Sequence, residues 1–295
     1  LFPYNLIKFC VSIIKSYKFL KLYNFDVLIS TGGYMSLPLC LAAYFLNIRI
    51  YIFEPNSVIG KANKLLLSFA EKIICYDTNL KGISKKFLNK IYLVKPLLKK
   101  NIYEYQKNKN TKFAEKKKLL IIGGSQGAKF FDEFITKIII KLSKTKKIQV
   151  LQQVININSK EKIKDLYEKN HIQYELFDFD EKILIRAVNC DLAITRSGAS
   201  TIAELAYLNI PFVAIPFPYA KDDHQYYNAE FYKKNESCWL VMQKDIDENS
   251  FIDLMIKIFE DQNEYLTKKN NLIHLTKENT WEKNKTKIIE LINEN

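Results

Sequence analysis

Cysteine and histidine are scarce in this chain, and this scarcity limits the disulfides and metal sites that it can form. The 295 residues include five cysteines, three histidines and eight glycines. The cysteines lie far apart, mostly in apolar runs, and their odd number argues against a framework of paired disulfides. Neither the cysteines nor the histidines have the spacing of metal ligands. We therefore expect buried free thiols in a reducing cytoplasm, and neither a metal nor another cofactor.

The chain also lacks a run of about 18 apolar residues, so no membrane-spanning helix is expected. Residues 1–23 are basic and apolar but have no small-residue cleavage site, which predicts an amphipathic helix rather than a signal peptide. In that helix Leu6, Phe9, Ile13 and Ile14 recur at helical spacing. An ordinary helix packed on a sheet would show the same pattern.

Acidic residues are outnumbered, with 32 Asp and Glu against 45 Lys and Arg, for a net charge of +13. Such a charge suits either nucleic acid or an anionic membrane surface. The chain has no basic motif interleaved with aromatic residues, so nucleic acid is not expected as a partner. The bias toward Lys, Asn and Ile would also scatter lysines without functional cause, so charge alone decides little.

Short apolar strands alternate with helices along two stretches of the chain, which predicts parallel βαβ units. Strands are expected at 26–30, 48–53, 72–76, 91–94, 119–122, 148–152, 174–176, 192–195 and 212–215. Helices are expected at 37–46, 62–70, 130–142, 160–170 and 181–187, and from 252 onward. The polar, Lys- and Asn-rich stretch 99–118 is expected to link two domains, at 1–105 and 112–295.

The most informative stretch is Thr-Arg-Ser-Gly-Ala-Ser-Thr-Ile-Ala-Glu-Leu, residues 195–205. Small residues open a helix there, and its first amide groups suit a phosphate or diphosphate. Glu204 lies two turns inside, where its carboxylate can accept hydrogen bonds from the vicinal hydroxyls of a ribose. Gln225 and Asn228 are three residues apart and would share one face of a following helix. Together these residues predict a nucleotide-sugar site.

A simpler interpretation of the same stretch is a well-capped helix, with Ser197 as the cap and Glu204 as a solvated charge. The neighbours of Glu204 are apolar, however, so the acid is expected near a buried face, where it needs a partner.

Three segments in order resemble the MurG family, whose members add N-acetylglucosamine to lipid I to make lipid II. They are Thr-Gly-Gly-Tyr-Met-Ser at 31–36 with Phe-Glu-Pro-Asn at 53–56, Gly-Gly-Ser-Gln-Gly-Ala at 123–128, and the stretch from 195 to 229. The resemblance runs from near residue 1 to about residue 240. It implies an α/β fold of the GT-B type, with two Rossmann-like domains whose parallel sheets face a cleft.

The resemblance also implies roles for particular residues. Glu54 becomes the candidate catalytic base, and Gly32, Gly33 and Tyr34 would bind the acceptor. Donor binding falls to Asn56, Ser125, Asp180, Ala199, Ser200, Thr201, Ile202, Ala203, Glu204, Gln225 and Asn228. The partners would be UDP-N-acetylglucosamine, undecaprenyl-linked lipid I and an anionic membrane surface at the cytoplasmic face of a bacterial inner membrane. A glycolipid acceptor, or UDP-sugar binding without turnover, stays open as an alternative.

The chain departs from the family pattern in several places. Phe53 and Pro55 replace two polar residues, and Leu98 stands where the family has an arginine that meets the donor. Lys99 or Lys100 would be an imperfect substitute, since a point charge lacks the planar guanidinium fork. The family's Gly-Gly-x-Gly-Gly-His loop is absent from this sequence. We therefore expect a first domain that is incomplete, and residues 1–295 alone to bind UDP-sugar, to transfer none and to aggregate.

Overall fold

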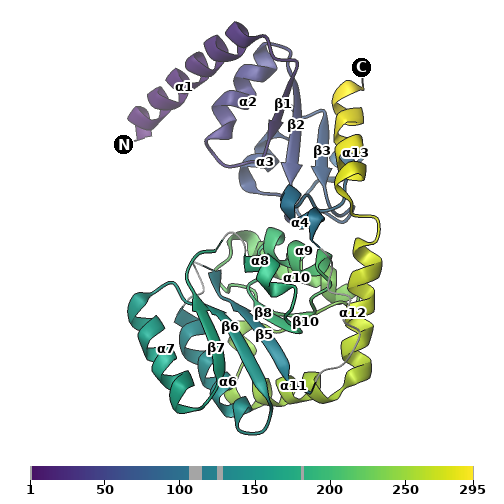
Figure 1. Cartoon of the computed structure of the whole chain (residues 1–295). Coiled ribbons are helices and arrows are strands. Elements are labelled where there is room, and N and C mark those ends of the chain that lie inside the picture. The colour runs from purple at the N-terminus through teal and green to yellow at the C-terminus, as the bar shows by residue number, and fades with distance from the viewer. Residues whose placement is uncertain (1, 106–114, 125–128, 181–182, 295) are drawn as a thin grey trace. The chain divides into compact units, whose positions relative to one another are not determined.

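The computed structural model describes residues 2–105, 115–124, 129–180 and 183–294 (Figure 1). The chain forms two compact units: unit 1 comprises residues 1–97 and 282–295, and unit 2 comprises residues 98–281. Each unit contains one parallel sheet with helices packed on it. The expected α/β class with two Rossmann-like domains is therefore confirmed.

Unit 1 contains a four-stranded parallel sheet in the order β1-β2-β3-β4. Its strands are β1 (Val27–Ser30), β2 (Arg49–Glu54), β3 (Lys72–Cys75) and β4 (Ile91–Leu93). Its helices are α1 (Phe2–Tyr23), α2 (Ser36–Phe45), α3 (Lys61–Leu66), the 3-10 helix η1 (Lys85–Lys90) and α13 (Trp281–Asn293). All four strands were expected within two residues of these bounds.

Alternation along β2 explains how the sheet of unit 1 is covered. Ile50 and Ile52 face one side, where they pack with residues of α1, α2 and α3. Tyr51 faces the other side, in a cluster with Leu291 of α13. Because side chains of a strand point alternately to opposite faces, one short apolar strand packs against the helices on both sides of the sheet.

Unit 2 contains a six-stranded parallel sheet in the order β10-β9-β8-β5-β6-β7. Its strands are β5 (Lys117–Ile122), β6 (Ile148–Gln153), β7 (Gln173–Phe177), β8 (Leu192–Thr195), β9 (Phe212–Ala214) and β10 (Trp239–Leu240). Its α-helices are α4 (Lys100–Glu104), α6 (Thr136–Ser143), α7 (Ile157–Lys169), α8 (Ile183–Ala187), α9 (Ala199–Tyr207), α10 (His224–Lys234), α11 (Glu248–Glu260) and α12 (Gln262–Thr276). A π-helical turn, η2 (Phe131–Ile135), leads into α6, and two 3-10 turns are η3 (Lys221–Asp223) and η4 (Gln243–Asp245).

The sheet of unit 2 is buried on both faces, as its apolar strands predict. Leu119 and Ile121 of β5 pack with residues of α6, α7 and α11. Leu120, on the opposite face, packs with residues of α8, α9 and α10. This arrangement leaves the carboxyl ends of the strands as the edge of the sheet where loops and helix starts meet, and where ligands bind in open α/β sheets.

The two compact units differ from the expected domains in two respects. The first part of the expected linker forms helix α4 and belongs to unit 2, because Leu98 and Ile102 are buried in the core of that unit. The carboxy-terminal helix α13 lies with unit 1, because Leu291 is buried among Tyr51, Ile74 and Val94. The order of elements along the chain does not indicate that the last helix goes back to unit 1.

Candidate functional site

The carboxyl ends of β5 and β8 meet at the point where the strand order of unit 2 reverses. From β5 the chain runs outward through β6 and β7, then returns to place β8 on the other side of β5. Helices leaving such neighbours pack on opposite faces of the sheet and open a crevice between their starts. The glycine turn after β5 and the helix α9 after β8 therefore flank one location.

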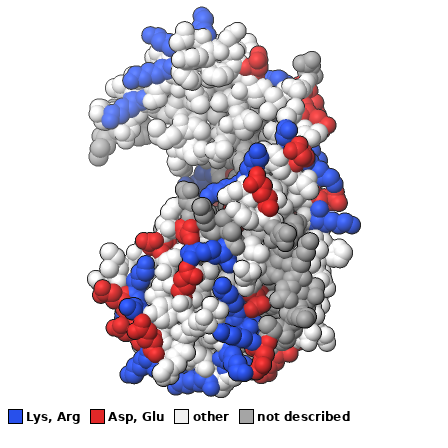
Figure 2. Space-filling model, in the orientation of Figure 1, with Lys and Arg blue, Asp and Glu red and all other residues white. Residues whose placement is uncertain are grey.

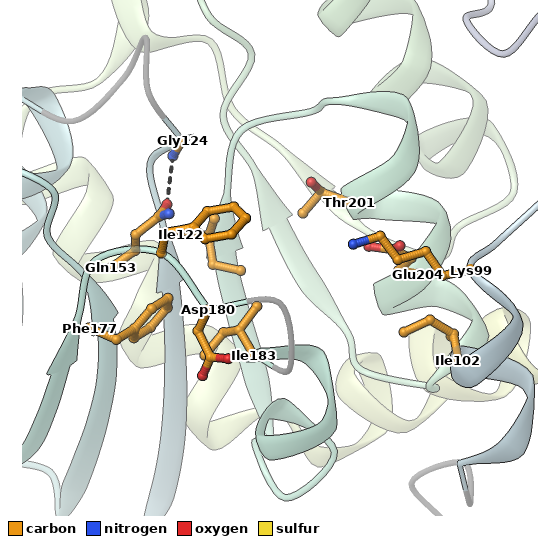
Figure 3. Close-up of a pocket in the computed structure, with 11 residues that line it drawn as sticks. Lys99, Ile102, Ile122, Gly124, Gln153, Phe177, Asp180, Ile183, Thr201 and Glu204 are labelled. Atoms are coloured by element: carbon orange, nitrogen blue, oxygen red, sulfur yellow. Dashed lines mark hydrogen bonds between the residues drawn. The ribbon is translucent and has the colours of Figure 1, made fainter.

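A cavity of about 230 Å³ lies at this location (Figure 3). It is lined by Lys99, Ile102, Ile122, Gly124, Gln153, Phe177, Phe179, Asp180, Ile183, Thr201 and Glu204, all of unit 2. Three of the expected donor-binding residues, Asp180, Thr201 and Glu204, thus share one cavity. Its walls combine aromatic and aliphatic side chains with a few polar groups, as is typical of small-molecule sites.

The first turn of α9 has no side-chain cap. The residue at the N-cap position is Gly198, in extended conformation and without a side-chain hydrogen bond. The alternative that Ser197 caps this helix is therefore wrong: its hydroxyl is buried and has no hydrogen-bond partner among the described residues. The leading amide groups of α9, from Ala199 to Thr201, remain available to an anion.

Glu204 is a buried carboxylate on the side of α9 that faces the cavity. The residue is only 9% exposed and lies between the buried residues Ala203 and Leu205. Burial raises the pKa of Glu204 to about 7, and the positive charge of Lys99 acts in the opposite direction. An acid held in this state gains most from a ligand that donates hydrogen bonds to its ionised form.

The other expected α9 residues divide by exposure. Ile202 and Ala203 point into the core of unit 2, so only their backbone can serve a ligand. Ala199 and Ser200 lie in the first turn, ahead of Thr201, whose side chain lines the cavity.

The glycine turn after β5 is shaped by close packing. A side chain at Gly123 would come within 3.0 Å of Phe131, and Gly124 has a positive φ of 62°. The amide of Gly124 donates to the side-chain oxygen of Gln153, 3.1 Å away, at the end of β6 (Figure 3). The expected donor contact Ser125 lies just beyond, outside the described residues.

Asp180 contributes to the cavity with its carboxylate already paired. Its Oδ2 accepts from Arg186, 2.6 Å away, on α8. Asp178, two residues earlier, accepts from the amide of Phe179. The pair has Asp-x-Asp spacing, yet both carboxylates are engaged within the protein, and no group of three acidic, cysteine or histidine residues suited to a metal occurs in the described part of the chain.

Gln225 and Asn228 share one face of α10, as their spacing predicts, and that face is turned to the start of α9. The side-chain oxygen of Gln225 accepts from the amides of Ser197, at 3.2 Å, and Phe217, at 2.9 Å. Asn228 donates its side-chain amide to the carbonyl of Ser197, 3.1 Å away. Both residues therefore hold the loops around the start of α9, and the amide nitrogen of Gln225 is the part left for a ligand.

Arg196 is a feature of this site that the sequence did not single out. The guanidinium donates to the carbonyls of Ile215 and Pro216, each 3.1 Å away, and to the side chain of Gln243, 2.7 Å away. It also lies over the rings of Phe130, Phe131 and Phe217. Burial lowers the pKa of Arg196 to about 10, so it stays charged at neutral pH and ties the loop after β8 to the loop after β9.

In unit 1, Glu54 is the centre of a hydrogen-bonded loop. Its Oε1 accepts from the amide and side chain of Asn56, at 3.2 and 3.0 Å. Its Oε2 accepts from the amide of Gly60, at 2.8 Å, and from the side chain of Asn63, at 2.9 Å. The carboxylate is buried and organises the loop, a role that sequence reasoning did not foresee.

The expected acceptor residues form the turn after β1. Gly32 and Gly33 have φ values of 87° and 86°, which side-chain-bearing residues rarely adopt. A side chain at Gly32 would also meet Asn63, 3.0 Å away, so this turn packs directly on the Glu54 loop. Tyr34 is exposed beside them, and helix α2 starts two residues later, at Ser36.

A second cavity in unit 2, of about 390 Å³, is larger but lies elsewhere. It is lined only by residues of η2, α6 and α7, among them Asp132, Lys137 and Ser159. No strand end or glycine turn contributes to it, so the smaller cavity is the better candidate for a nucleotide site.

Comparison with known proteins gives a consistent result. The glycosyltransferase family 28 C-terminal domain matches residues 118–285, and the family's N-terminal domain matches residues 2–75. A Pelagibacter ubique (strain HTCC1062) protein named UDP-N-acetylglucosamine--N-acetylmuramyl-(pentapeptide) pyrophosphoryl-undecaprenol N-acetylglucosamine transferase is 47% identical over 293 residues, which cover 99% of this chain and 82% of that protein. A protein of the same name from Rickettsia canadensis (strain McKiel) is 35% identical, covering 88% of this chain and 75% of its own length.

Solved structures agree at the level of the fold. Acinetobacter baumannii MurG matches with a TM-score of 0.78 and 22% identity, covering 98% of this chain and 80% of that one. A UDP-GlcNAc 2-epimerase from Neisseria meningitidis, bound to UDP-GlcNAc, matches with a TM-score of 0.65 and 13% identity, covering 97% and 81%. With two family domains in order and a relative 47% identical along nearly the whole chain, this protein belongs to the MurG family of glycosyltransferases, within glycosyltransferase family 28.

Proposed function

We propose that this chain binds UDP-N-acetylglucosamine in the cavity of unit 2 and transfers its N-acetylglucosamine to lipid I, forming lipid II with inversion at the anomeric carbon. The observation that carries the proposal is the pairing of two features on α9. A buried carboxylate, Glu204, and a helix start without a side-chain cap face the same small cavity.

Each part of the donor has a matching group. The uracil ring fits between the aromatic and aliphatic side chains at the ends of β5 and β7, where the backbone of Asp180 can read its edge. The ribose hydroxyls donate to Glu204, and the diphosphate lies at the first amides of α9. Gln225 and Asn228 keep those amides in place from the neighbouring helix.

The transfer breaks the bond between the sugar and the UDP oxygen and forms a bond from the muramoyl C4 hydroxyl to the anomeric carbon. Negative charge develops on the departing UDP, and the amides of α9 stabilise it without rearranging. A general base takes the hydroxyl proton. Glu54 stays our candidate for that base, and in this role it would give up hydrogen bonds to its own loop.

We further propose that unit 1 meets an anionic membrane surface through α1. Leu6, Ile7, Val11 and Ile14 are exposed on this helix, whereas Ile13 packs toward α2. The helix contains four lysines and no acidic residue, and Figure 2 shows basic side chains among uncharged ones along it. No described helix is long and apolar enough to span a bilayer. An amphipathic helix of this kind lies at the interface instead.

A paired experiment tests the proposed reaction. Glu204→Ala is expected to weaken UDP binding by about 1–3 kcal/mol, because it leaves the ribose hydroxyls unpaired. Isothermal calorimetry with UDP measures this, and Glu161→Ala, an exposed acid on α7, serves as the matched control. Unchanged UDP affinity in the Glu204 variant would remove this residue from the site.

Turnover is measured separately, with labelled UDP-N-acetylglucosamine and lipid I in detergent micelles. Formation of lipid II that is lost in the Glu204 variant supports the full proposal, and it overturns the expectation that residues 1–295 alone transfer no sugar. UDP binding without any lipid II would favour the alternative, a UDP-sugar-binding protein without turnover. Transfer to a diacylglycerol acceptor but not to lipid I would instead indicate a glycolipid synthase.

A further inference from the structure

The larger cavity of unit 2, of about 390 Å³, contains a buried carboxylate oxygen for which the described part of the chain supplies no hydrogen-bond donor. We propose that this cavity binds a small primary amine, whose ammonium group donates to Asp132 and whose aliphatic body lies against the neighbouring apolar side chains. The cavity shares no lining residue with the donor cavity, so this inference does not depend on the proposed function.

Asp132 lies in the π-helical turn η2, a type of turn that is frequent at functional sites, and it is only 7% exposed. Its Oδ1 is buried and has no hydrogen-bond partner among the described residues. Burial raises the pKa of Asp132 to about 6, a side-chain hydrogen bond with Ser159 of α7 acts in the opposite direction, and the charge of Glu133 raises it further. A buried carboxylate is costly unless it is paired, so a ligand that donates to Oδ1 has much to gain.

The other polar groups beneath the cavity are already engaged with one another. The hydroxyl of Thr136 accepts from the side-chain amide of Gln152, 3.1 Å away, and the side-chain oxygen of Gln152 accepts from the hydroxyl of Tyr167, 2.5 Å away. The start of α7 has its own cap, because the side-chain oxygen of Asn156 accepts from the amide of Ser159, 3.1 Å away. These contacts leave Oδ1 to a group that enters the cavity.

The charges at this end of the cavity favour a cation over a neutral donor. Glu133 follows Asp132 in η2, and its negative charge is felt at that carboxyl. An ammonium group is attracted to both acids, and a charge-assisted hydrogen bond is about twice as strong as a neutral one. Lys137 and Lys162 also line the cavity, but both are exposed, so solvent screens their charges. Lys137 is moreover ion-paired with Glu248 of α11.

The remaining lining suits a short aliphatic chain. Ile163 of α7 is buried, whereas Ile140 of α6 and Leu166 of α7 are partly buried, and all three contribute to the cavity. An alkyl chain that covers them removes apolar surface from water. The volume of about 390 Å³ lies at the lower end of the range for small-molecule sites. Pentylamine is therefore a suitable probe.

Ligand-observed NMR titrations of the full chain compare pentylamine with pentanol and norleucine. Pentylamine is expected to bind about tenfold more tightly than pentanol, which has the same chain but no charge. Norleucine adds a carboxylate beside the ammonium and distinguishes an amino acid from a simple amine. It is expected to bind more weakly than pentylamine, because its carboxylate would lie near Glu133. Equal affinities for pentylamine and pentanol, tighter binding of norleucine, or no saturable binding would each overturn the proposal.

Two variants locate the ligand. In Asp132→Asn, which keeps the shape but removes the charge, pentylamine affinity is expected to fall about tenfold and pentanol affinity to stay within about twofold. Asp165→Asn is the matched control, since Asp165 is an exposed acid of α7 outside the lining. Leu166→Trp fills the cavity and is expected to weaken binding of both compounds. Equal losses of pentylamine affinity in the two aspartate variants, or undiminished binding to Leu166→Trp, would place the ligand elsewhere and overturn the proposal.

A pH series on the same samples gives an independent readout. An ammonium group favours the ionised form of Asp132, whose pKa in the empty cavity is about 6. Pentylamine affinity is therefore expected to rise about tenfold between pH 5 and pH 7 in the wild type, and to stay level in Asp132→Asn. A wild-type profile as level as that of the variant would contradict an ammonium group at this carboxylate. Circular dichroism melts confirm that each variant is folded.

Discussion

At the scale of single residues, the site depends on a carboxylic acid held away from water. Glu204 has its pKa raised to about 7 by burial, against an ordinary value of 4.5, and Lys99 only partly opposes this. In the empty folded chain the ionised form is therefore disfavoured. The stability that the neutral acid contributes is fully present below pH 4.5 and is lost as pH rises through about 7. A ligand whose hydroxyl groups donate hydrogen bonds favours the ionised form of Glu204. The affinity for such a ligand therefore rises with pH, whereas the stability of the empty chain falls.

Uridine affinity is accordingly expected to rise between pH 6 and pH 8, by about tenfold at most for one ionisation. Calorimetry at a series of pH values tests this. Uridine is the better probe because the terminal phosphate of UDP titrates in the same range. In Glu204→Gln the dependence is expected to vanish. A wild-type profile as flat as that of the variant would contradict hydrogen bonding of the ribose to ionised Glu204.

Much of this residue-level picture could be predicted from the sequence, and the remainder has a clear physical origin. The position of Glu204 follows from helical spacing among apolar neighbours, which is local information. The hydrogen bonds of Gln225 to Ser197 and Phe217, and of Arg196 to Gln243, join residues separated by up to 47 positions. Contacts of that kind depend on which strands become neighbours, so a pattern in one segment cannot reveal them.

At the scale of elements, the longer strands were easier to predict than very short strands and the caps of helices. Each of the nine expected strands is present, because an apolar run ending in a turn is a strong local signal. The strand β10 was missed, since its two residues, Trp239 and Leu240, are too few to show alternation. Helix α9 was expected with Ser197 as an alternative cap, and the structure instead has Gly198 at its start, without a side-chain cap.

Helix α1 gives the prediction at this scale. Replacing Lys8 and Lys15 with glutamate is expected to lower affinity for anionic vesicles about tenfold or more, since each lysine near such a surface contributes about 1 kcal/mol. Co-sedimentation with vesicles of phosphatidylglycerol and phosphatidylethanolamine measures this. Lys144→Glu with Lys169→Glu, both exposed in unit 2, changes the net charge equally and is expected to have little effect. Equal losses in both double variants would mean that total charge, rather than α1, directs binding.

At the scale of the whole molecule, the chain forms two units, and both ends of unit 2 continue into unit 1. The carboxy-terminal helix α13 follows unit 2 in sequence but is part of unit 1. Arg49 donates to the carbonyl of Ile292, 2.8 Å away, and the hydroxyl of Tyr51 donates to the carbonyl of Leu291, 3.1 Å away. Apolar contacts and hydrogen bonds thus both fix the helix to unit 1. Sequence reasoning placed it in the second domain because only chain order was visible.

This arrangement predicts that α13 can be damaged without affecting the donor site. Leu291 is fully buried, at 0% exposure, whereas Ile289 on the same helix is 47% exposed. Leu291→Asp is expected to destabilise unit 1 by about 3 kcal/mol or more, since it places a charge in an apolar cluster and removes a buried side chain. Ile289→Asp introduces the same charge at an exposed site and is expected to have little effect.

Hydrogen exchange in unit 1 and the affinity of unit 2 for UDP make the consequence measurable, because each reports on one unit. In Leu291→Asp, hydrogen exchange in residues 27–93 is expected to accelerate, since these strands lose the cover of α13. The affinity for UDP is expected to match that of Ile289→Asp, because the cavity is lined by unit 2 alone. A fall in UDP affinity specific to Leu291→Asp would show that unit 2 depends on unit 1 for its fold, and that donor binding is a property of the whole chain.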